Sequence, residues 1–437
     1  MIGSITTVLS NTTWASWFVA LVVIYYIVLW CFSFSWRPLG VESSNFHPFM
    51  VILVPALNEQ EVIKKSLSDL LQVNYDDFMI ILMNDDSEDD TSAIARSMSE
   101  QTSKLMVVDR HMPMARNGKS SVLNHGLSVV SEIIADEPSR FGGRDASEIL
   151  IGIVDADGSL DRDTLRIIAP YFADPTVGQL QIGVKIANAD TNLLTRLQDM
   201  EFVGFSSFVQ VARDRIGSSG LGGNGQFTRL SALAELGPEP WTPTALTEDL
   251  DLGLALVGLG WGTRFTNQCF VHQQGLTKWR PLLRQRTRWI QGHYQCWKYI
   301  PQLLMSDKVK LATKIDLTAY LLLVTTVVVV SYLLVTGLLT IFNIHTFENT
   351  FLDFVPEGYP RRLINGFLML APIVAFLNTY QIYSDYKLRF WEIPAFGFVF
   401  TLYSYVWVIA SLRAWSRMAF RRNEWVKTPR IPTTSSK

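Results

Sequence analysis

Apolar residues are concentrated at the two ends of this 437-residue chain, and this distribution constrains the fold more than any other feature. Residues 17–34 (WFVALVVIYYIVLWCFSF) carry no charge and are just long enough to cross about 30 Å of hydrocarbon. Further apolar runs occupy residues 317–344, 363–382 and 393–412. Residues 40–300 hold most of the acidic residues and alternate short apolar runs with polar segments. We therefore predict a polar globular domain attached to membrane-embedded helices.

The apolar ends allow two other interpretations. A secretory signal peptide is also apolar, but no Lys or Arg precedes residues 17–34 and no small-residue cleavage site follows them. We therefore favour an uncleaved anchor. Buried core helices are the alternative for the later runs, whose length and apolarity favour the membrane.

These features divide the chain into five predicted regions. They are a transmembrane anchor at 15–36, a globular domain at 40–280, amphipathic interfacial helices at 281–310, a transmembrane region of about three segments at 314–412, and a basic tail at 413–437. The third region mixes aromatic, basic and aliphatic residues, which suits helices that lie in the plane of a membrane interface.

The basic tail creates a topological conflict. It carries seven Arg and Lys residues against Glu424, so the excess of positive charge predicts a cytoplasmic location. If the globular domain is cytoplasmic and all three later runs cross the membrane, however, the tail ends outside. Either one of these runs is re-entrant or interfacial, or the charge rule fails here.

Composition excludes some classes of function. The 38 Lys and Arg residues against 40 Asp and Glu residues give a net charge of -2, which excludes a generally basic nucleic-acid binder. The three cysteines (Cys31, Cys269 and Cys296) form no CxxC pair, so they indicate a reducing compartment and argue against a structural zinc site.

Three predicted strands in the globular domain end in acidic residues. The segments MVILVPALNE (50–59), FMIILMNDDSEDD (78–90) and EILIGIVDADG (148–158) are apolar runs that finish with carboxylates. Helical patterns at residues 62–71 and 91–99 follow the first two. This rhythm predicts an α/β fold with a parallel sheet whose functional residues lie at the carboxyl ends of the strands.

Three local motifs could carry chemistry. Asp155 and Asp157 at a strand exit suit Mg²⁺ or Mn²⁺ bridging a diphosphate, although a solvated turn closed by Gly158 is favoured for this motif taken alone. The acids of TED (247–249) stand at a predicted helix start, where simple capping is the alternative. QRTRW (285–289) places two arginines beside a tryptophan ring, and simple anchoring of the helix at a membrane interface is the alternative explanation for this combination.

Together the motifs VPALNE, NDDSEDDT, RNGKSSVLN, VDAD, GGNGQFTR, TEDLDLG and QRTRW resemble the membrane-integrated glycosyltransferase family 2. The resemblance is closest to its processive branch, the cellulose, chitin, hyaluronan and poly-N-acetylglucosamine synthases. It implies a GT-A-like, Rossmann-related cytoplasmic catalytic domain flanked by transmembrane helices in a multi-pass protein of the cell membrane.

The resemblance also implies donor-binding residues. Glu59 and Asp85 match nucleotide contacts that read uracil and ribose, and Lys119 lies close to the donor pocket. Asp155 and Asp157 match the pair that holds the diphosphate and its metal, Mg²⁺ or Mn²⁺.

On the acceptor side, the resemblance assigns catalysis to TED. Asp249, with Glu248 beside it, matches the general base that removes the acceptor hydroxyl proton. Gln285, Arg288 and Trp289 match the motif that closes over the donor diphosphate and stacks against the acceptor sugar. Inverting transfer needs such a base, and the leaving diphosphate needs positive charge. Trp241 and Trp261 are candidates for further acceptor walls.

Two departures from the family pattern follow from the sequence. Asn84-Asp85-Asp86 stands where the family often has two aspartates and a glycine, which leaves Asp85 as the better nucleotide contact. One anchor precedes the domain, so any sugar channel would depend on the C-terminal helices or on a partner, either a small accessory membrane subunit or a homo-oligomer.

Three functions follow from these observations. The main prediction is processive addition of sugar from a UDP-sugar, with N-acetylglucosamine or glucose preferred, to a β-linked polysaccharide coupled to export. The alternative is transfer of one sugar to a lipid such as polyprenyl phosphate or ceramide. The third possibility is a transporter or an inactive scaffold. The scarcity of ionisable residues in the apolar runs argues against a transporter, and the complete acidic motifs argue against an inactive scaffold. The predicted partners are the UDP-sugar, a polysaccharide or glycolipid acceptor and membrane lipids, with no nucleic acid.

Overall fold

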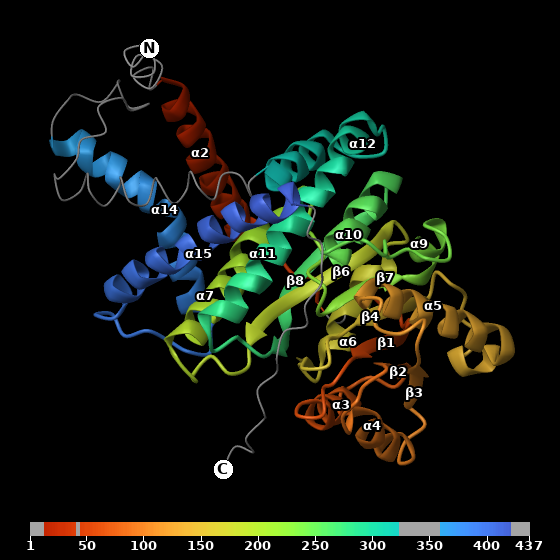
Figure 1. Cartoon of the computed structure of the whole chain (residues 1–437). Helices are drawn as coiled ribbons and strands as arrows, with labels where there is room; N and C mark the ends of the chain where they lie inside the picture. Colours follow the sequence, from red (N-terminus) through yellow and green to blue (C-terminus); the bar gives the residue numbers. More distant parts are fainter. Residues whose placement is uncertain (1–12, 41–43, 323–358, 421–437) are drawn as a thin grey trace.

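The computed structural model describes residues 13–40, 44–322 and 359–420. Its centre is an eight-stranded sheet in the order β3-β2-β1-β4-β7-β6-β8-β5 (Figure 1). The strands are β1 (Phe49–Ala56), β2 (Phe78–Asp85), β3 (Leu105–Arg110), β4 (Ile149–Ile153), β5 (Ser159–Leu160), β6 (Val177–Ile186), β7 (Gln226–Arg229) and β8 (Gly262–Gln273).

The parallel half of the sheet confirms the α/β prediction. β1 pairs in parallel with β2 and β4, and β2 pairs in parallel with β3. β7 then pairs antiparallel with both β4 and β6. Because β1, β2 and β4 run in one direction, the residues that follow them reach the same edge of the sheet.

Helices cover both faces of the sheet, which explains why β1 and β2 are apolar throughout. Alternate residues of β1 point into two separate cores, with Met50, Ile52 and Val54 in one and Val51 and Leu53 in the other. The first core includes α3 (Ile63–Leu71), α4 (Thr91–Ser99) and α6 (Thr164–Ile168), and the second includes α5 (Lys119–Asp136), α9 (Leu230–Glu235) and α10 (Glu248–Leu259). Strands buried on both faces read as continuous apolar runs.

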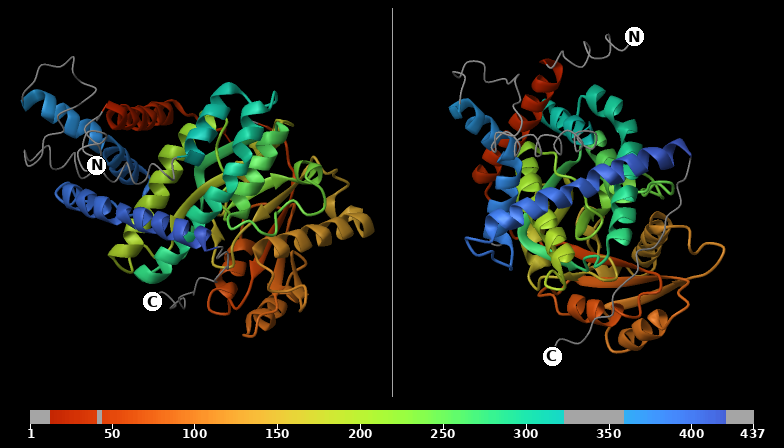
Figure 2. Two further views of the ribbon diagram at one scale, coloured as in Figure 1. Left: turned by 45° about the horizontal axis from the view of Figure 1, so that its top comes forward. Right: turned by 60° about the vertical axis from the view of Figure 1, so that its left-hand side comes forward.

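A second group of helices lies beyond β6 and β8. α7 (Leu193–Gly204), the π-helical turn η4 (Phe205–Gln210) and α8 (Val211–Ile216) follow one another without a break. The others are α2 (Thr13–Ser35), α11 (Trp279–Gln295), α12 (Tyr299–Met305), α14 (Tyr359–Tyr383) and α15 (Ile393–Ala419). α2 and α14 contact each other and extend away from the sheet on the same side of the molecule (Figure 2).

Half of α2 packs against the globular domain. Tyr25 donates a hydrogen bond to Asp316 (2.9 Å), Leu29 is buried beside Phe208, and Trp36, just after the helix, donates to Asp214 (2.9 Å). The predicted anchor is therefore a helix, but its second half contacts protein.

Multiple membrane crossings are not confirmed. Among the described residues, Ile393–Ala419 is the one helix long and apolar enough to cross a membrane. The apolar run at 317–344 lies mostly outside the described residues, as does the tail from residue 421. The division into anchor, interfacial helices and transmembrane region therefore stays a prediction.

Candidate active site

The acids predicted at the strand ends gather at one edge of the sheet. Glu59 follows β1 and is 4% exposed, and its backbone N–H donates to Thr91 Oγ1 (2.7 Å) at the start of α4. Asp85 ends β2, and Asp155 and Asp157 follow β4. The parallel strand register therefore assembles the predicted donor side of the site.

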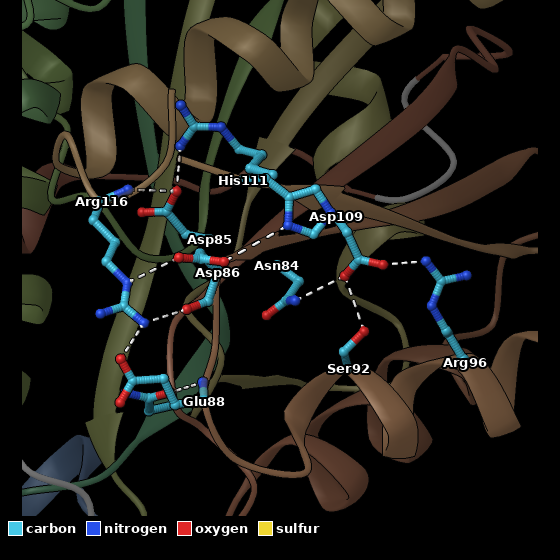
Figure 3. Close-up of polar contacts among 11 residues, drawn as sticks. Asn84, Asp85, Asp86, Glu88, Ser92, Arg96, Asp109, His111 and Arg116 are labelled. Carbon is cyan, nitrogen blue, oxygen red and sulfur yellow. Dashed lines mark hydrogen bonds and ion pairs between the residues drawn. The ribbon is translucent and has the colours of Figure 1, made fainter. Parts of the chain in front are cut away.

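Arginines neutralise the acids after β2 (Figure 3). Asp85 Oδ1 accepts from Arg110 Nη1 (2.5 Å) and from the backbone N–H of Arg116 (3.1 Å). Burial raises the pKa of Asp85, whereas these two donors act in the opposite direction. The amide of Asn84 donates to Asp109 (2.7 Å), which explains why an amide fits at this position.

Three non-glycine residues with left-handed backbones meet at this place. They are Asn58 (φ 51°), Asp86 (φ 63°) and Arg116 (φ 62°). The Arg116 side chain contacts the carboxylates of Asp86 (3.4 Å) and Glu88 (2.6 Å), and the Glu88 N–H donates to Asn58 Oδ1 (2.8 Å). Such backbone strain persists only where surrounding contacts fix it, and it often marks functional sites.

Lys119, the first residue of α5, connects the two halves of the site. Its Nζ lies 2.6 Å from Asp155 Oδ1, 3.3 Å from Glu248 Oε1 and 3.5 Å from the carbonyl oxygen of Gly223. Burial disfavours its charge, but Asp155 and Glu248 together raise its pKa. The structure thus brings the predicted donor-binding lysine between VDAD and TED.

Asp249 is the second residue of α10, the helix predicted to start at TED, and its carboxylate lies against the backbone of Gly223. A Cβ at Gly223 would lie 3.1 Å from Asp249 Oδ2, and its φ of 78° also favours glycine. Asp249 is partly exposed, which the predicted role of general base requires. Burial, followed by the charge of Glu248, raises its pKa to about 7, although Lys119 and Arg288 oppose the shift. A base poised near neutral pH suits proton abstraction.

α11 braces the start of α10. Arg288 Nη1 donates to the carbonyl oxygen of Leu246 (2.7 Å), and Gln295 Oε1 accepts from the Leu246 N–H (3.0 Å). A Cβ at Gly292 would lie 2.5 Å from Thr247 Oγ1, so this contact requires glycine. The helix that carries QRTRW therefore fixes the backbone that presents Asp249.

The remaining motif residues face different surroundings. Gln285 accepts from Arg286 Nη1 (2.6 Å), and the half-buried ring of Trp289 lies 4.2 Å from the Arg286 guanidinium. Trp241 is fully buried in the core with Leu252 and Leu256, so its interpretation as an acceptor wall is wrong. Its backbone N–H and carbonyl oxygen both bond the Asn124 amide, which fixes it there.

The chemistry of Asp155 and Asp157 fits a divalent ion that takes most of its ligands from substrate. Their carboxylates flank the turn after β4, where Asp157 Oδ2 accepts from the Gln274 N–H (3.2 Å). Within the described part of the chain, no three His, Cys, Asp or Glu residues gather as a closed metal site. Mg²⁺ typically uses one or two carboxylates and completes its shell with phosphate oxygens and water.

Sequence reasoning missed Arg110 and Arg116. Arg110 is the last residue of β3 and is 3% exposed, and it also donates to Ser121 (2.8 Å) at the start of α5. Arg116 stands in the quoted RNGK segment. The sequence did offer one signal for Arg110, because a basic residue at the end of a strand can pair with the carboxylates predicted at the ends of neighbouring strands.

Comparison with known proteins agrees with this geometry. The model of the family described as "Glycosyltransferase like family 2" matches residues 47–292. The β-monoglucosyldiacylglycerol synthase of Synechocystis sp. is 31% identical over 403 residues, covering 89% of this chain and 76% of the relative. The enzyme of the same name from Trichormus variabilis is 28% identical over 404 residues, covering 89% and 77%.

Among solved structures, mannosyltransferase PcManGT from Pyrobaculum calidifontis superposes with a TM-score of 0.58 at 18% identity, covering 93% of this chain and 97% of that one. This likeness shows the fold, a mixed α/β GT-A-like glycosyltransferase architecture. The family match covers more than half of the chain and includes every motif residue of the site. The chain therefore belongs to glycosyltransferase family 2 and is a hexosyltransferase of that family.

Proposed function

We propose that this glycosyltransferase transfers one glucose from UDP-glucose, with inversion, to the hydroxyl group of a membrane lipid of the diacylglycerol type. The observation that carries the reaction is the position of Asp249, a partly exposed carboxyl in the first turn of α10 that lies against Gly223 and whose pKa burial and Glu248 raise to about 7. The two relatives from Synechocystis sp. and Trichormus variabilis, both β-monoglucosyldiacylglycerol synthases, support a lipid acceptor. They favour the single-sugar alternative over the polysaccharide synthase that the sequence first suggested.

In the proposed reaction, ionised Asp249 accepts the proton of the lipid hydroxyl. The hydroxyl oxygen attacks the anomeric carbon from the face opposite the diphosphate. The new bond to oxygen forms as the bond between the anomeric carbon and the diphosphate breaks, and UDP leaves with the bonding electrons. One displacement converts an α-linked donor into a β-linked product.

The negative charge that develops on the diphosphate needs nearby cations. Lys119 lies 2.6 Å from Asp155 and 3.3 Å from Glu248, so its ammonium is held where the donor and catalytic acids meet. We propose that Asp155 and Asp157 hold Mg²⁺ or Mn²⁺ against the diphosphate. Such an ion would supply Lewis-acid stabilisation of the leaving group. PcManGT, a protein of the same fold, was solved with GDP-Man and Mn2+, which supports a divalent ion.

The other motif residues have proposed binding roles. Glu59 and Asp85 would contact the nucleoside, since Glu59 follows β1 and Asp85 ends the neighbouring parallel strand β2 at the donor edge. Gln285 and Arg288 would close over the diphosphate from α11, and Trp289 would present its ring to the acceptor.

Product analysis separates the two acceptor classes. Purified full-length protein would be incubated with radiolabelled UDP-glucose, diacylglycerol-containing vesicles and Mg²⁺ or Mn²⁺. We expect label in an organic-soluble lipid carrying one glucose, with no signal from Asp249→Asn. Water-soluble or insoluble polymer would instead support the polysaccharide synthase. UDP release from UDP-N-acetylglucosamine and GDP-mannose would test the choice of donor, and chelation with EDTA would test the ion.

A further inference from the structure

We propose that α15 lies in the plane of the membrane surface and does not cross the bilayer, although its length and apolarity would allow it to cross. The partner of its exposed face is the headgroup and upper acyl region of one leaflet. This inference concerns how the enzyme sits on a membrane and does not depend on the identity of the sugar or the lipid acceptor.

The first observation is the alignment of α15 with α11. Ring contacts join Trp279 to Tyr403 (6.1 Å), Trp289 to Trp407 (6.3 Å) and Tyr294 to Trp415 (6.2 Å). In these three pairs the residue number on α15 increases together with the residue number on α11, so the two helices run in the same direction. The two helices therefore contact each other over about four turns with the same chain direction. In Figure 1 the ribbon of α15 passes in front of those of α7 and α11.

A buried polar cluster holds this alignment. Arg286 Nη2 pairs with Glu201 Oε2 (2.8 Å), and the Tyr403 hydroxyl donates to the same carboxylate. The Arg286 guanidinium lies close to the rings of both Trp289 (4.2 Å) and Trp407 (5.3 Å). Because Arg286 is fully buried and Glu201 belongs to α7, this cluster joins α7, α11 and α15 as one packed unit. α15 cannot tilt into a crossing orientation without taking α11 with it.

The charges of α11 decide which orientation is favourable. Arg280 and Arg284 are exposed, and the neighbouring Trp279 contacts Tyr403, close to the midpoint of the apolar run of α15. In a crossing orientation, these arginines would lie near the centre of the hydrocarbon, where charged side chains are costly. In the plane of the interface, they lie among phosphates and water, and Trp279 lies at headgroup level, where tryptophan is enriched.

α15 also presents one continuous apolar face along its length. Four side chains spaced as on one helix face are between 50% and 63% exposed: Phe398, Leu402, Ile409 and Leu412. Residues on the opposite face, including Phe400, Tyr403 and Ala410, are buried against protein. α15 thus covers α11 and turns its own apolar face outward, which is the arrangement of an amphipathic interfacial helix.

This orientation resolves the conflict over the basic tail. The sequence predicts three crossings after the globular domain, which place the tail on the opposite side. Without a crossing at α15, two remain, and the tail returns to the side of the catalytic domain. That side is the one that its Arg and Lys residues predict.

Depth measurements on the full-length protein test the proposal. Nitroxide labels would be placed singly at Leu402→Cys and Leu412→Cys, in a Cys31→Ser background because Cys31 is exposed, in vesicles of phosphatidylcholine and phosphatidylglycerol. Ser97→Cys on α4, an exposed position, provides the aqueous control. We expect equal depths at the two α15 positions from oxygen and nickel-complex collision rates. A crossing helix would separate them by about 15 Å, and a difference of that size would overturn the proposal.

The side of the tail is a second, independent readout. Ser436→Cys and Ser97→Cys would be exposed to a membrane-impermeant thiol reagent in sealed vesicles of one orientation. We expect both positions to be labelled or both to be protected. Labelling of one without the other would place the tail across the membrane from the catalytic domain and would contradict an in-plane α15 combined with two crossings before it. The depth measurement decides the orientation of α15 itself, and the side of the tail checks the number of crossings.

Discussion

Two acidic clusters in the site differ in how their charge is compensated. After β2, Asp85 pairs with the buried Arg110, while Asp86 and Glu88 share Arg116. At the start of α10, Glu248 and Asp249 adjoin Asp155, and Lys119 contacts Asp155 and Glu248.

The consequence is a difference in function between the clusters. In the arginine-rich cluster each of the three carboxylates contacts an arginine, and hydrogen bonds hold the cluster, so we infer that it fixes the shape of the nucleoside pocket. At the start of α10, burial and then the charge of Glu248 raise the pKa of Asp249 to about 7, against the opposing charges of Lys119 and Arg288. Groups with such pKa values are candidates for acid–base chemistry.

The largest expected effect comes from Asp249→Asn. Loss of the base should lower kcat by about 10³-fold or more, because general base catalysis and the charge beside the reacting hydroxyl are both removed. UDP binding, measured by calorimetry, should change little. Asp251→Asn on the same helix is the matched control, because the Asp251 carboxylate is paired with Lys298 (2.6 Å). This variant should keep kcat within a few-fold of the value for the parent protein. Retained turnover in Asp249→Asn would reject the assignment of the base.

Arg110→Met tests the structural role of the first cluster. Arg110 and Asp85 have side chains that are 2% and 6% exposed, so the variant leaves a buried carboxylate without its cation. Removing one member of such a pair costs about 3 kcal/mol. Thermal unfolding should show a markedly lower Tm, and the double variant with Asp85→Asn should recover part of the loss. An unchanged Tm would mean that the pair does not stabilise this pocket.

Lys119→Met should affect catalysis more than stability. Its partly exposed ammonium lies between Asp155 and Glu248, and we expect about a 10²-fold loss of kcat because positive charge beside the leaving diphosphate is removed. The acid limb of the pH profile should also move upward, because Lys119 lowers the pKa of Asp249. Lys119→Arg should retain part of the activity. If the pH profile of Lys119→Met is unchanged, the lysine does not act on Asp249.

The sheet was predictable because each apolar run indicates a buried strand. The acids at the strand ends were predictable because the carboxylates that follow each run mark where the strand ends. The pairing of Asp85 with Arg110 was not, because it depends on register between β2 and β3 and on side-chain direction. Trp241 was misinterpreted because an indole suits a core as well as a sugar-binding surface. The packing of α15 along α11 was also hidden, since length and apolarity are the same for crossing and surface-lying helices.

The smallest predicted effect, from Glu248→Gln, is the sharpest test of the contrast between the clusters. The negative charge of Glu248 is the second largest cause of the raised pKa of Asp249, and burial is the largest. With that charge removed, Asp249 should ionise at lower pH, and the acid limb of kcat/KM should move down by up to about one pH unit, equivalent to about 1.4 kcal/mol. The control is Asp86→Asn in the first cluster, which should leave the limb in place.

Stability should follow the same sign. An acid whose pKa is raised by folding binds its proton more tightly in the folded state, so it costs stability as pH rises from about 4 to about 7. Glu248→Gln should weaken this decline, so that its Tm falls less than that of the parent protein between these values. A parallel decline in both proteins, together with an unmoved acid limb, would show that Glu248 does not set the ionisation of Asp249. The contrast would then rest on burial, opposed at Asp85 by the Arg116 N–H and by Arg110.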